Sequence, residues 1–188
     1  MNQIELFILD TLVRGLSNAF FDVVMPLITW LGNSGRFWIA VAVVFLCIRA
    51  TRKTGVTLAG ALLLELALVD GLLKPLIGRA RPFMLNPTVT LLITRPTDGS
   101  FPSGHTSTSF AAAFVIFHFN KKWGIAAYVL AALIAFSRLY LYVHFPSDVL
   151  GGMVIGTLIG MFTVWVADKA VDRWQTRQTK QEKETVSE

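Results

Sequence analysis

The 188-residue sequence is poor in charge and in cysteine. Charged side chains make up 15% of it and hydrophobic side chains 54%, a balance too apolar for a water-soluble globule of this size. The one cysteine, Cys47, excludes a disulfide framework and a thiolate metal site, because both need several cysteines. Since a free cysteine behaves as a small apolar residue, we expect Cys47 to fill space in a membrane-embedded core.

The formal net charge is nevertheless +5. A basic chain can bind nucleic acid, but that function needs basic side chains gathered along one face. Here the lysines and arginines lie between and beyond the apolar stretches, which is typical of topology signals in membrane proteins. We therefore predict membrane lipids, and no nucleic acid, as partners.

The apolar residues gather in runs that predict membrane-spanning helices. Residues 19–31 contain Asp22 and Pro26 and are marginal as a span, whereas residues 4–16 show the pattern of an amphipathic helix at the membrane interface. The predicted fold is all-α, a polytopic membrane helix bundle with five or six transmembrane helices and an N-terminal interfacial helix. The clear runs are residues 37–48, 56–77, 106–119, 123–142 and 149–167.

The length of the chain supports one compact domain. We assign residues 1–168 to a membrane domain and residues 169–188 to a polar cytoplasmic tail. The tail carries too much charge to be ordered by burial, so it is predicted to be a solvated extension of the last helix or a disordered segment.

The distribution of basic residues predicts the orientation in the membrane. Residues 49–53, residues 121–122 and the tail are basic, and short basic segments are retained in the cytoplasm. Alternating helices then place the long loop 78–102 and the short connection 143–147 on the extracytoplasmic side. The loop contains three arginines that run against this trend, and we expect them to bind an anion. They are Arg79, Arg81 and Arg95.

Polar groups that apolar helices normally avoid gather in three segments on that side, and the first is KPLIGRARP, residues 74–82. Ionisable residues at membrane depth are functional candidates. Lys74 and Arg81 can meet at the end of one helix and hold a phosphate, the lysine as a point charge and the arginine as a planar fork. The alternative is that both side chains only extend to the membrane interface.

The second segment, PSGH, immediately precedes an apolar run. Ser103 can cap the helix that starts there, and Gly104 lets the backbone approach an anion at the helix N-terminus. A Pro-Ser-Gly sequence is also a common structural helix opening. The adjacent His105 favours the functional interpretation, because an imidazole can exchange protons with a bound phosphate ester.

The third segment is SRLYLYVHFPSD, residues 137–148. Arg138 lies at the outer end of a predicted helix, and Pro146 is predicted to open the next one, with Asp148 in its first turn. His144 and Asp148 can be an interfacial histidine and a carboxylate that offsets the helix dipole. Alternatively, Asp148 orients one ring nitrogen of His144 so that the other attacks phosphorus.

The three segments together resemble the signature of the type 2 phosphatidic acid phosphatase superfamily: Lys, six residues, Arg-Pro; then Pro-Ser-Gly-His; then Ser-Arg, five residues, His, three residues, Asp. The resemblance covers residues 56–167. It implies a membrane phosphatase domain, a phosphohistidine intermediate, and neither metal nor cofactor. By this resemblance the catalytic residues are His144 as nucleophile, Asp148 as its orienting partner and His105 as general acid, and the phosphate-binding residues are Lys74, Arg81, Ser103, Gly104 and Arg138.

The resemblance implies a lipid phosphate or diphosphate as substrate, and we favour undecaprenyl diphosphate. Phosphatidylglycerol phosphate, phosphatidic acid and lipid A phosphates are the alternatives. Two other classes of function stay open from the residues alone. One is a metal-dependent phosphatase with His105, His144 and Asp148 as ligands. The other is a transporter that uses Glu65, Asp70 and Lys74 as a charge relay, although Asp70 and Lys74 can simply neutralise each other.

Overall fold

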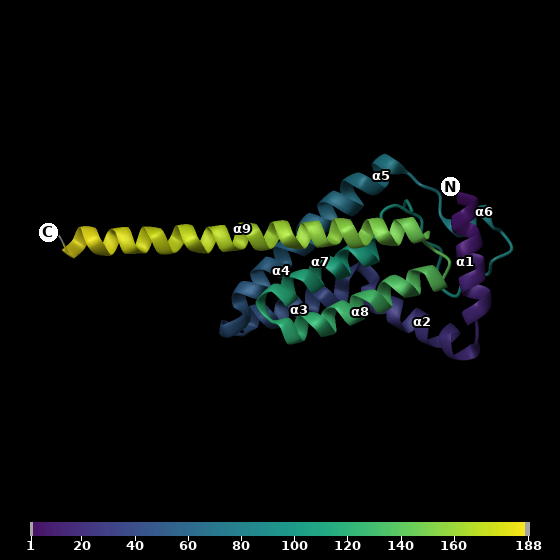
Figure 1. The fold of residues 1–188 in the computed structure, drawn as a ribbon, viewed down its shortest axis with the longest axis horizontal. Coiled ribbons are helices and arrows are strands. Elements are labelled where there is room, and N and C mark those ends of the chain that lie inside the picture. Colours follow the sequence, from purple (N-terminus) through teal and green to yellow (C-terminus); the bar gives the residue numbers. More distant parts are fainter. Residues whose placement is uncertain (1, 187–188) are drawn as a thin grey trace.

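The structure, a computed structural model, describes residues 2–186 and the side chains of residues 3–173. All regular elements in this range are helices (Figure 1), which confirms the predicted all-α membrane fold. The α-helices are α1 (Asn2–Leu16), α2 (Ala19–Gly32), α3 (Arg36–Cys47), α4 (Arg52–Glu65), α5 (Lys74–Ile77), α6 (Pro82–Leu85), α7 (Gly104–Phe119), α8 (Lys121–Tyr140) and α9 (Pro146–Val186). The 3₁₀ helices η1 (Asn33–Gly35) and η2 (Arg49–Thr51) precede α3 and α4, and the π-helical segment η3 (Leu66–Leu73) joins α4 to α5.

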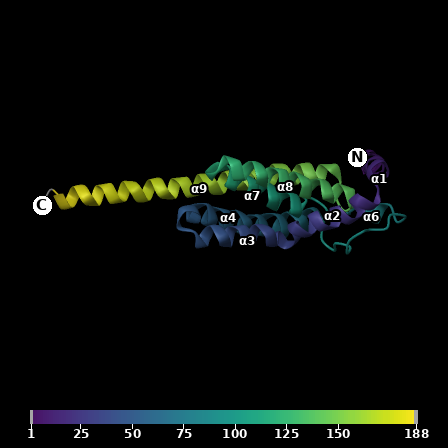
Figure 2. The same cartoon turned by 90° about the horizontal axis from the view of Figure 1, so that it is seen from below.

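The long helices run side by side, and α1 lies across one end of the bundle (Figures 1 and 2). The end next to α1, here called the site end, also holds α6, the long loop after it and the connection from α8 to α9. The opposite end holds the turns from α3 to α4 and from α7 to α8, and α9 extends beyond it. The basic segments predicted to share one side of the membrane therefore lie at this second end, and its cytoplasmic location stays a prediction.

Four helical segments of the described chain are long and apolar enough to cross a membrane: Ala19–Cys47, Arg49–Leu85, Lys121–Tyr140 and Pro146–Arg173. The marginal run 19–31 belongs to the first of these segments, together with α3. Between α2 and α3 the chain kinks at Ser34 and Gly35, whose φ angles of 53° and 63° are positive. Glycine adopts such angles without the steric penalty of a side chain.

Helix α7 has 16 residues and lies at the centre of the bundle, packed against α8, α9 and α4. Glycines on the neighbouring helices allow this close packing. A Cβ atom added to Gly156 of α9 would lie 2.2 Å from the carbonyl oxygen of Ser107, and one added to Gly124 of α8 would lie 2.1 Å from Cα of Phe117. Small residues at such crossings let helix backbones meet in a membrane, where van der Waals packing drives association.

The last helix continues through the polar segment to Val186, which is the helical form of the two predicted for the tail. Residues 187–188 lie outside the described chain. Asp168 of α9 pairs with Lys53 at 2.8 Å and with His118 at 3.2 Å, so α9 is tied to α4 and α7 at the end opposite α1.

The prediction that Cys47 fills space in the core is wrong, because its side chain is exposed at the end of α3. Helix α3 buries a narrow stripe that contains Trp38 and Ala42. Cys47 follows Ala42 by five residues, and at 3.6 residues per turn this spacing places it off that stripe.

Candidate active site

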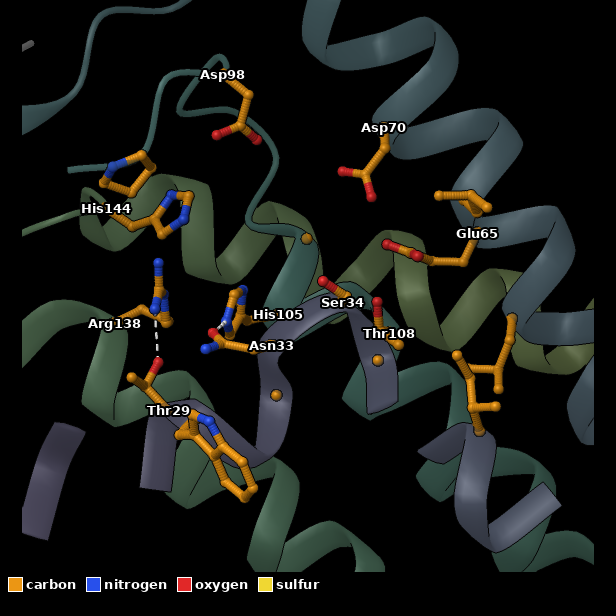
Figure 3. A pocket seen from close by; sticks show the side chains of 18 of the residues that line it. Thr29, Asn33, Ser34, Glu65, Asp70, Asp98, His105, Thr108, Arg138 and His144 are labelled. Atoms are coloured by element: carbon orange, nitrogen blue, oxygen red, sulfur yellow. Dashed lines mark hydrogen bonds between the residues drawn. The ribbon is translucent and has the colours of Figure 1, made fainter. Parts of the chain in front are cut away.

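A cavity of about 1310 Å³ extends from the site end along the bundle (Figure 3), and its lining comes from α2, η1, α3, the segment from α4 to α5, the long loop, the start of α7, the end of α8 and the connection that follows α8. Its lining brings together residues of all three sequence segments, which are far apart along the chain. Ser103 and Asp148 lie behind the lining. The predicted site residues that line the cavity are Lys74, Arg81, Gly104, His105, Arg138 and His144.

His144 lies in the short connection between α8 and α9 and is buried. Its Nε2 is 3.1 Å from Nη1 of Arg81. A guanidinium only donates hydrogen bonds, so Nε2 carries a lone pair and the ring proton is on Nδ1. Burial, followed by the charges of Arg81 and Arg138, lowers the pKa of His144 well below its ordinary value. A neutral imidazole, with the lone pair of Nε2 directed at a cation, is therefore the form of this histidine at neutral pH.

Asp148 stands behind His144 in the first turn of α9, which Pro146 opens as predicted. The Asp148 side chain is fully buried, and its Oδ2 lies 3.6 Å from Nδ1 of His144. The same oxygen accepts hydrogen bonds from the Ser100 hydroxyl at 2.5 Å and from the backbone N–H of Phe145 at 2.8 Å. These bonds fix the carboxylate, as an orienting group requires.

Ser100 is a contact that the sequence analysis did not identify. Its hydroxyl donates to Asp148, and its Oγ also lies 3.5 Å from Nδ1 of His144. The side chain is fully buried. Ser100 is therefore next to both His144 and Asp148, whose Nδ1 and Oδ2 atoms are 3.6 Å apart.

Arg79, one of the three arginines expected to bind an anion, binds two carboxylates of the protein itself. Its guanidinium pairs with Oδ1 of Asp148 and with Oε2 of Glu5, both at 2.6 Å, and lies 4.3 Å from the centre of the Phe145 ring. Glu5 of α1 also accepts the backbone N–H of Ser147 at 3.0 Å. Burial alone would raise the pKa of Glu5, but the bonds from Ser147 and Arg79 lower it.

Lys74 and Arg81, the predicted phosphate clamp, both contact Asp98 of the long loop. Nζ of Lys74 lies 2.6 Å from Oδ2 of Asp98, and Nη2 of Arg81 lies 2.8 Å from Oδ1. Lys74 also pairs with Asp70 at 2.6 Å. Burial alone would raise the pKa of Asp98, but Lys74, followed by Arg81, lowers it to about 2.

Arg138 is the third cation of the cavity. It is buried at the end of α8, and Figure 3 shows its guanidinium beside His144 and His105. Nη1 donates to the hydroxyl of Thr29 at 2.5 Å, whereas Nε has no hydrogen-bond acceptor among the described residues. A buried donor without an acceptor is costly, so Arg138 is a cation of the cavity lining whose hydrogen-bonding capacity is not filled by the described residues.

His105 is positioned by the kink between α2 and α3, where residues 32–35 have the sequence Gly-Asn-Ser-Gly. Its Nε2 lies 2.9 Å from Oδ1 of Asn33. An amide oxygen only accepts, so Nε2 holds the proton in this contact. A Cβ atom added to Gly32 would lie 2.7 Å from Cδ2 of the His105 ring, and the glycine thus makes room for the imidazole.

Ser103 and Gly104 take different places. Ser103 occupies the N-cap position of α7 without a capping bond from its side chain. Its backbone N–H donates to the carbonyl of Asp148 at 3.0 Å, and its Oγ accepts from Thr106 at 3.0 Å. Gly104 lines the cavity, where an added Cβ would lie 2.9 Å from Nζ of Lys74. The structure therefore brings Gly104, and not Ser103, into the cavity.

Away from the cations the cavity continues between α3 and α4 along apolar side chains. Several of them also have large exposed fractions, as expected where a bundle faces lipid. One cavity thus joins a cationic end to an apolar groove, a combination that fits an anionic head group with a long hydrocarbon chain. The apolar lining includes Ile39, Val43, Leu46, Leu62, Leu63 and Leu66.

The chain is similar to known membrane proteins. The chain is 32% identical over 151 residues to the bacitracin transport permease protein BcrC of Bacillus licheniformis, an alignment that covers 79% of this chain and 74% of the relative. It is 35% identical over 144 residues to an undecaprenyl-diphosphatase of Sulfolobus acidocaldarius, covering 74% of this chain and 69% of the relative.

A solved structure is similar as well. The crystal structure of a transmembrane PAP2 type phosphatidylglycerolphosphate phosphatase from Bacillus subtilis matches with a TM-score of 0.72 and 27% identity, over 89% of this chain and 86% of that chain. Residues 54–172 match the family model of the PAP2 superfamily. This range contains all three sequence segments and most of the cavity. The chain therefore belongs to the PAP2 superfamily, as a member of its membrane phosphatases.

Proposed function

We propose that this protein hydrolyses a lipid phosphate or diphosphate through a phosphohistidine intermediate on His144. The single observation that carries the proposal is the environment of Nε2. This nitrogen has a lone pair and lies at the cavity end where Lys74, Arg81 and Arg138 gather. A neutral nucleophile surrounded by cations suits attack on an anionic phosphoryl group, because the cations stabilise the charge on its oxygens.

In the first step the lone pair of Nε2 attacks phosphorus, and the bond from phosphorus to the leaving oxygen breaks. His105, protonated on both ring nitrogens before this step, donates one proton to that oxygen and becomes neutral, and the lipid departs as an alcohol or a monophosphate. In the second step His105 removes a proton from water, the water oxygen attacks phosphorus, and the N–P bond breaks. Inorganic phosphate leaves, and the electron pair returns to Nε2.

The residues behind His144 act through its orientation. The imidazole becomes positively charged when the N–P bond forms, and the Asp148 carboxylate stabilises this charge through Nδ1. Ser100 and Arg79 hold the carboxylate with contacts of 2.5 and 2.6 Å. They are positioning residues, because neither one lines the cavity.

The proposed chemistry needs no metal. In the metal-dependent alternative Asp148 would be a ligand, but it lies behind the cavity lining and accepts hydrogen bonds from three donors. Three cationic side chains supply the positive charge that a metal would contribute. Phosphate release from a detergent-solubilised lipid phosphate should therefore continue in excess chelator. Loss of activity in chelator that returns with a divalent metal would overturn this part of the proposal.

For the substrate we favour undecaprenyl diphosphate, in keeping with the apolar groove and with the named activity of the Sulfolobus relative. The basic residues at the opposite end favour hydrolysis on the extracytoplasmic side. Phosphatidylglycerol phosphate is the alternative that the Bacillus subtilis structure favours; phosphatidic acid and lipid A phosphates follow. The ratio of kcat/KM values for these purified lipids decides, and a value for undecaprenyl diphosphate below the others would reject our choice.

A transport function is favoured by the name of the Bacillus licheniformis relative, a bacitracin transport permease protein. Members of the charge relay that it would use bind groups outside the relay: Lys74 pairs with Asp98 at 2.6 Å, and Glu65 accepts a hydrogen bond from Ser107. Hydrolysis by the solubilised protein separates the two functions, because transport requires a sealed membrane.

A further inference from the structure

All hydrogen-bond donors of Arg81 are occupied. A guanidinium has five N–H groups. Nε donates to the backbone carbonyl of Asp98, and Nη1 donates to the carbonyl of Val143 and to Nε2 of His144. Nη2 donates to Oδ1 of Asp98 and to the carbonyl of Gly99. A phosphate can bind this arginine only if one of these acceptors leaves.

The acceptor best able to leave is the Asp98 carboxylate. Three of the others are backbone carbonyls, and the fourth is the proposed nucleophile. Asp98 belongs to the loop between α6 and α7, and 47% of its side chain is exposed. Figure 3 shows its carboxylate directed into the cavity. Its two oxygens bind Lys74 and Arg81 at 2.6 and 2.8 Å, and they stand in for two oxygens of a bound phosphate.

We propose that Asp98 is an exchange ligand, whose carboxylate leaves Lys74 and Arg81 when the substrate phosphoryl group binds and returns to them when product phosphate departs. This inference rests on the proposed function. Asp98 thereby lowers the affinity of the site for inorganic phosphate and increases the rate at which the product leaves.

The electrostatics of the site give the reason for such a ligand. Inorganic phosphate carries between one and two negative charges near neutral pH, and three cations gathered at one end of the cavity would hold it tightly. Binding that is equally strong for substrate, transition state and product does not accelerate turnover. The Asp98 carboxylate competes with phosphate for the cations and so removes part of this uniform binding. It also pairs with Lys74 and Arg81 again as phosphate leaves, so neither cation is left buried and unpaired.

Asp70 provides a matched comparison. It also pairs with Lys74 at 2.6 Å, and its side chain is similarly exposed at 42%. However, Asp70 lies on the helical segment η3 and has no contact with Arg81 in the described structure. Replacing Asp70 removes the same charge from the same lysine while the Asp98 bridge stays in place.

Calorimetric titration of the detergent-solubilised protein with inorganic phosphate tests the proposal. Asp98→Asn and Asp98→Ala should each tighten phosphate binding on the order of tenfold or more, the typical value of one charge-assisted hydrogen bond. The inhibition constant of phosphate in turnover should fall by the same factor. KM and kcat should fall together if product release limits turnover. Asp70→Asn should change phosphate affinity less than either Asp98 variant.

Unchanged or weaker phosphate binding in both Asp98 variants would overturn the exchange role. Equal tightening in Asp70→Asn and Asp98→Asn would also overturn it, because the effect would then be a general loss of negative charge. Failure of the proposed function would look different, since the unmodified protein would not hydrolyse any lipid phosphate. The titration measures binding without turnover and therefore separates the two failures.

Discussion

The two sides of His144 differ in how their charges are held. On the cavity side, Lys74 and Arg81 are paired through Asp98, a loop residue with 47% of its side chain exposed. Behind the histidine, Asp148 and Ser100 are fully buried, and Arg79 ties Asp148 to α1 through Glu5. Partners on the first side can be exchanged, whereas those on the second are fixed.

This difference corresponds to two requirements of the proposed reaction. The phosphoryl group must enter and leave, so the cations that bind it need partners that can be replaced. The nucleophile must hold one orientation and one tautomer in every cycle, so the groups behind it need permanent ones. Mutations on the two sides should therefore differ in kind: those in front should change binding, and those behind should change kcat at nearly constant KM.

The largest effect is expected for His144 itself. His144→Ala should abolish turnover while phosphate still binds, because the three cations remain. His144→Asn should be equally inactive, since an amide cannot carry the phosphoryl group. His118→Ala is the matched control, because this histidine pairs with Asp168 at the opposite end of the bundle. Steady-state hydrolysis and phosphate titration measure both quantities, and near-native turnover in His144→Ala would reject the mechanism.

The next effect concerns His105 and depends on the leaving group. A lipid alkoxide is a poor leaving group, whereas an aryl phosphate or a lipid diphosphate expels a weaker base. General acid catalysis is typically worth about 10²–10⁴-fold where it is needed. His105→Ala should therefore slow phosphoenzyme formation much more with a lipid monoester than with the other two substrates. Single-turnover measurements isolate this step, and equal slowing across the three would leave His105 as a phosphate-binding residue only.

The origin of the site residues explains how much of the site could be predicted from the sequence. The motif residues come from helix ends and from turns next to helices, where periodicity and capping determine position, and six of them line one cavity. Three residues now added to the site, Asp98, Ser100 and Asn33, lie in the long loop or in the kink of η1. Their conformations depend on tertiary contacts across 24 to 72 positions of sequence, which local patterns do not encode.

The orientation of Arg79 shows the same limit from another direction. Its sequence position correctly indicated that it binds an anion, because a basic residue on that side runs against the charge trend. The anions are Glu5 and Asp148. The choice between a substrate and a carboxylate of the protein depends on α1, which is 74 positions away and lies across the site end (Figure 1).

A smaller effect is expected behind the nucleophile. Ser100→Ala removes the hydroxyl that donates a hydrogen bond of 2.5 Å to Asp148 and that lies 3.5 Å from Nδ1 of His144. We expect kcat to fall about tenfold, as for loss of one hydrogen bond to a charged group, with little change in KM. Ser100→Thr, which keeps the hydroxyl, should recover most of the activity. In the control Ser147→Ala, Arg79 loses one acceptor and Asp148 keeps all its donors, so kcat should fall less.

The smallest effect tests whether the fixed partners behind His144 include Glu5 of α1. Glu5→Gln keeps the size of the side chain and removes the charge that α1 presents to Arg79. Arg79 still holds Asp148 at 2.6 Å. Glu5 is buried and solvent reaches the pair only at the arginine, which is 17% exposed, so we expect a loss of roughly two- to fivefold in kcat. Asp10→Asn is the control on the same helix, because Asp10 accepts the hydroxyl of Tyr142 at 2.8 Å and does not contact Arg79 in the described structure.

Salt sharpens this last measurement. Screening weakens ion pairs that solvent can reach, so the difference in kcat between the unmodified protein and Glu5→Gln should shrink as ionic strength rises. The difference for Ser100→Ala should persist, because that contact is fully buried. If Glu5→Gln lowers kcat as much as Ser100→Ala does at every salt concentration, α1 is one of the fixed partners that orient His144 through Asp148. The boundary between fixed and replaceable partners would then have to include the N-terminal helix.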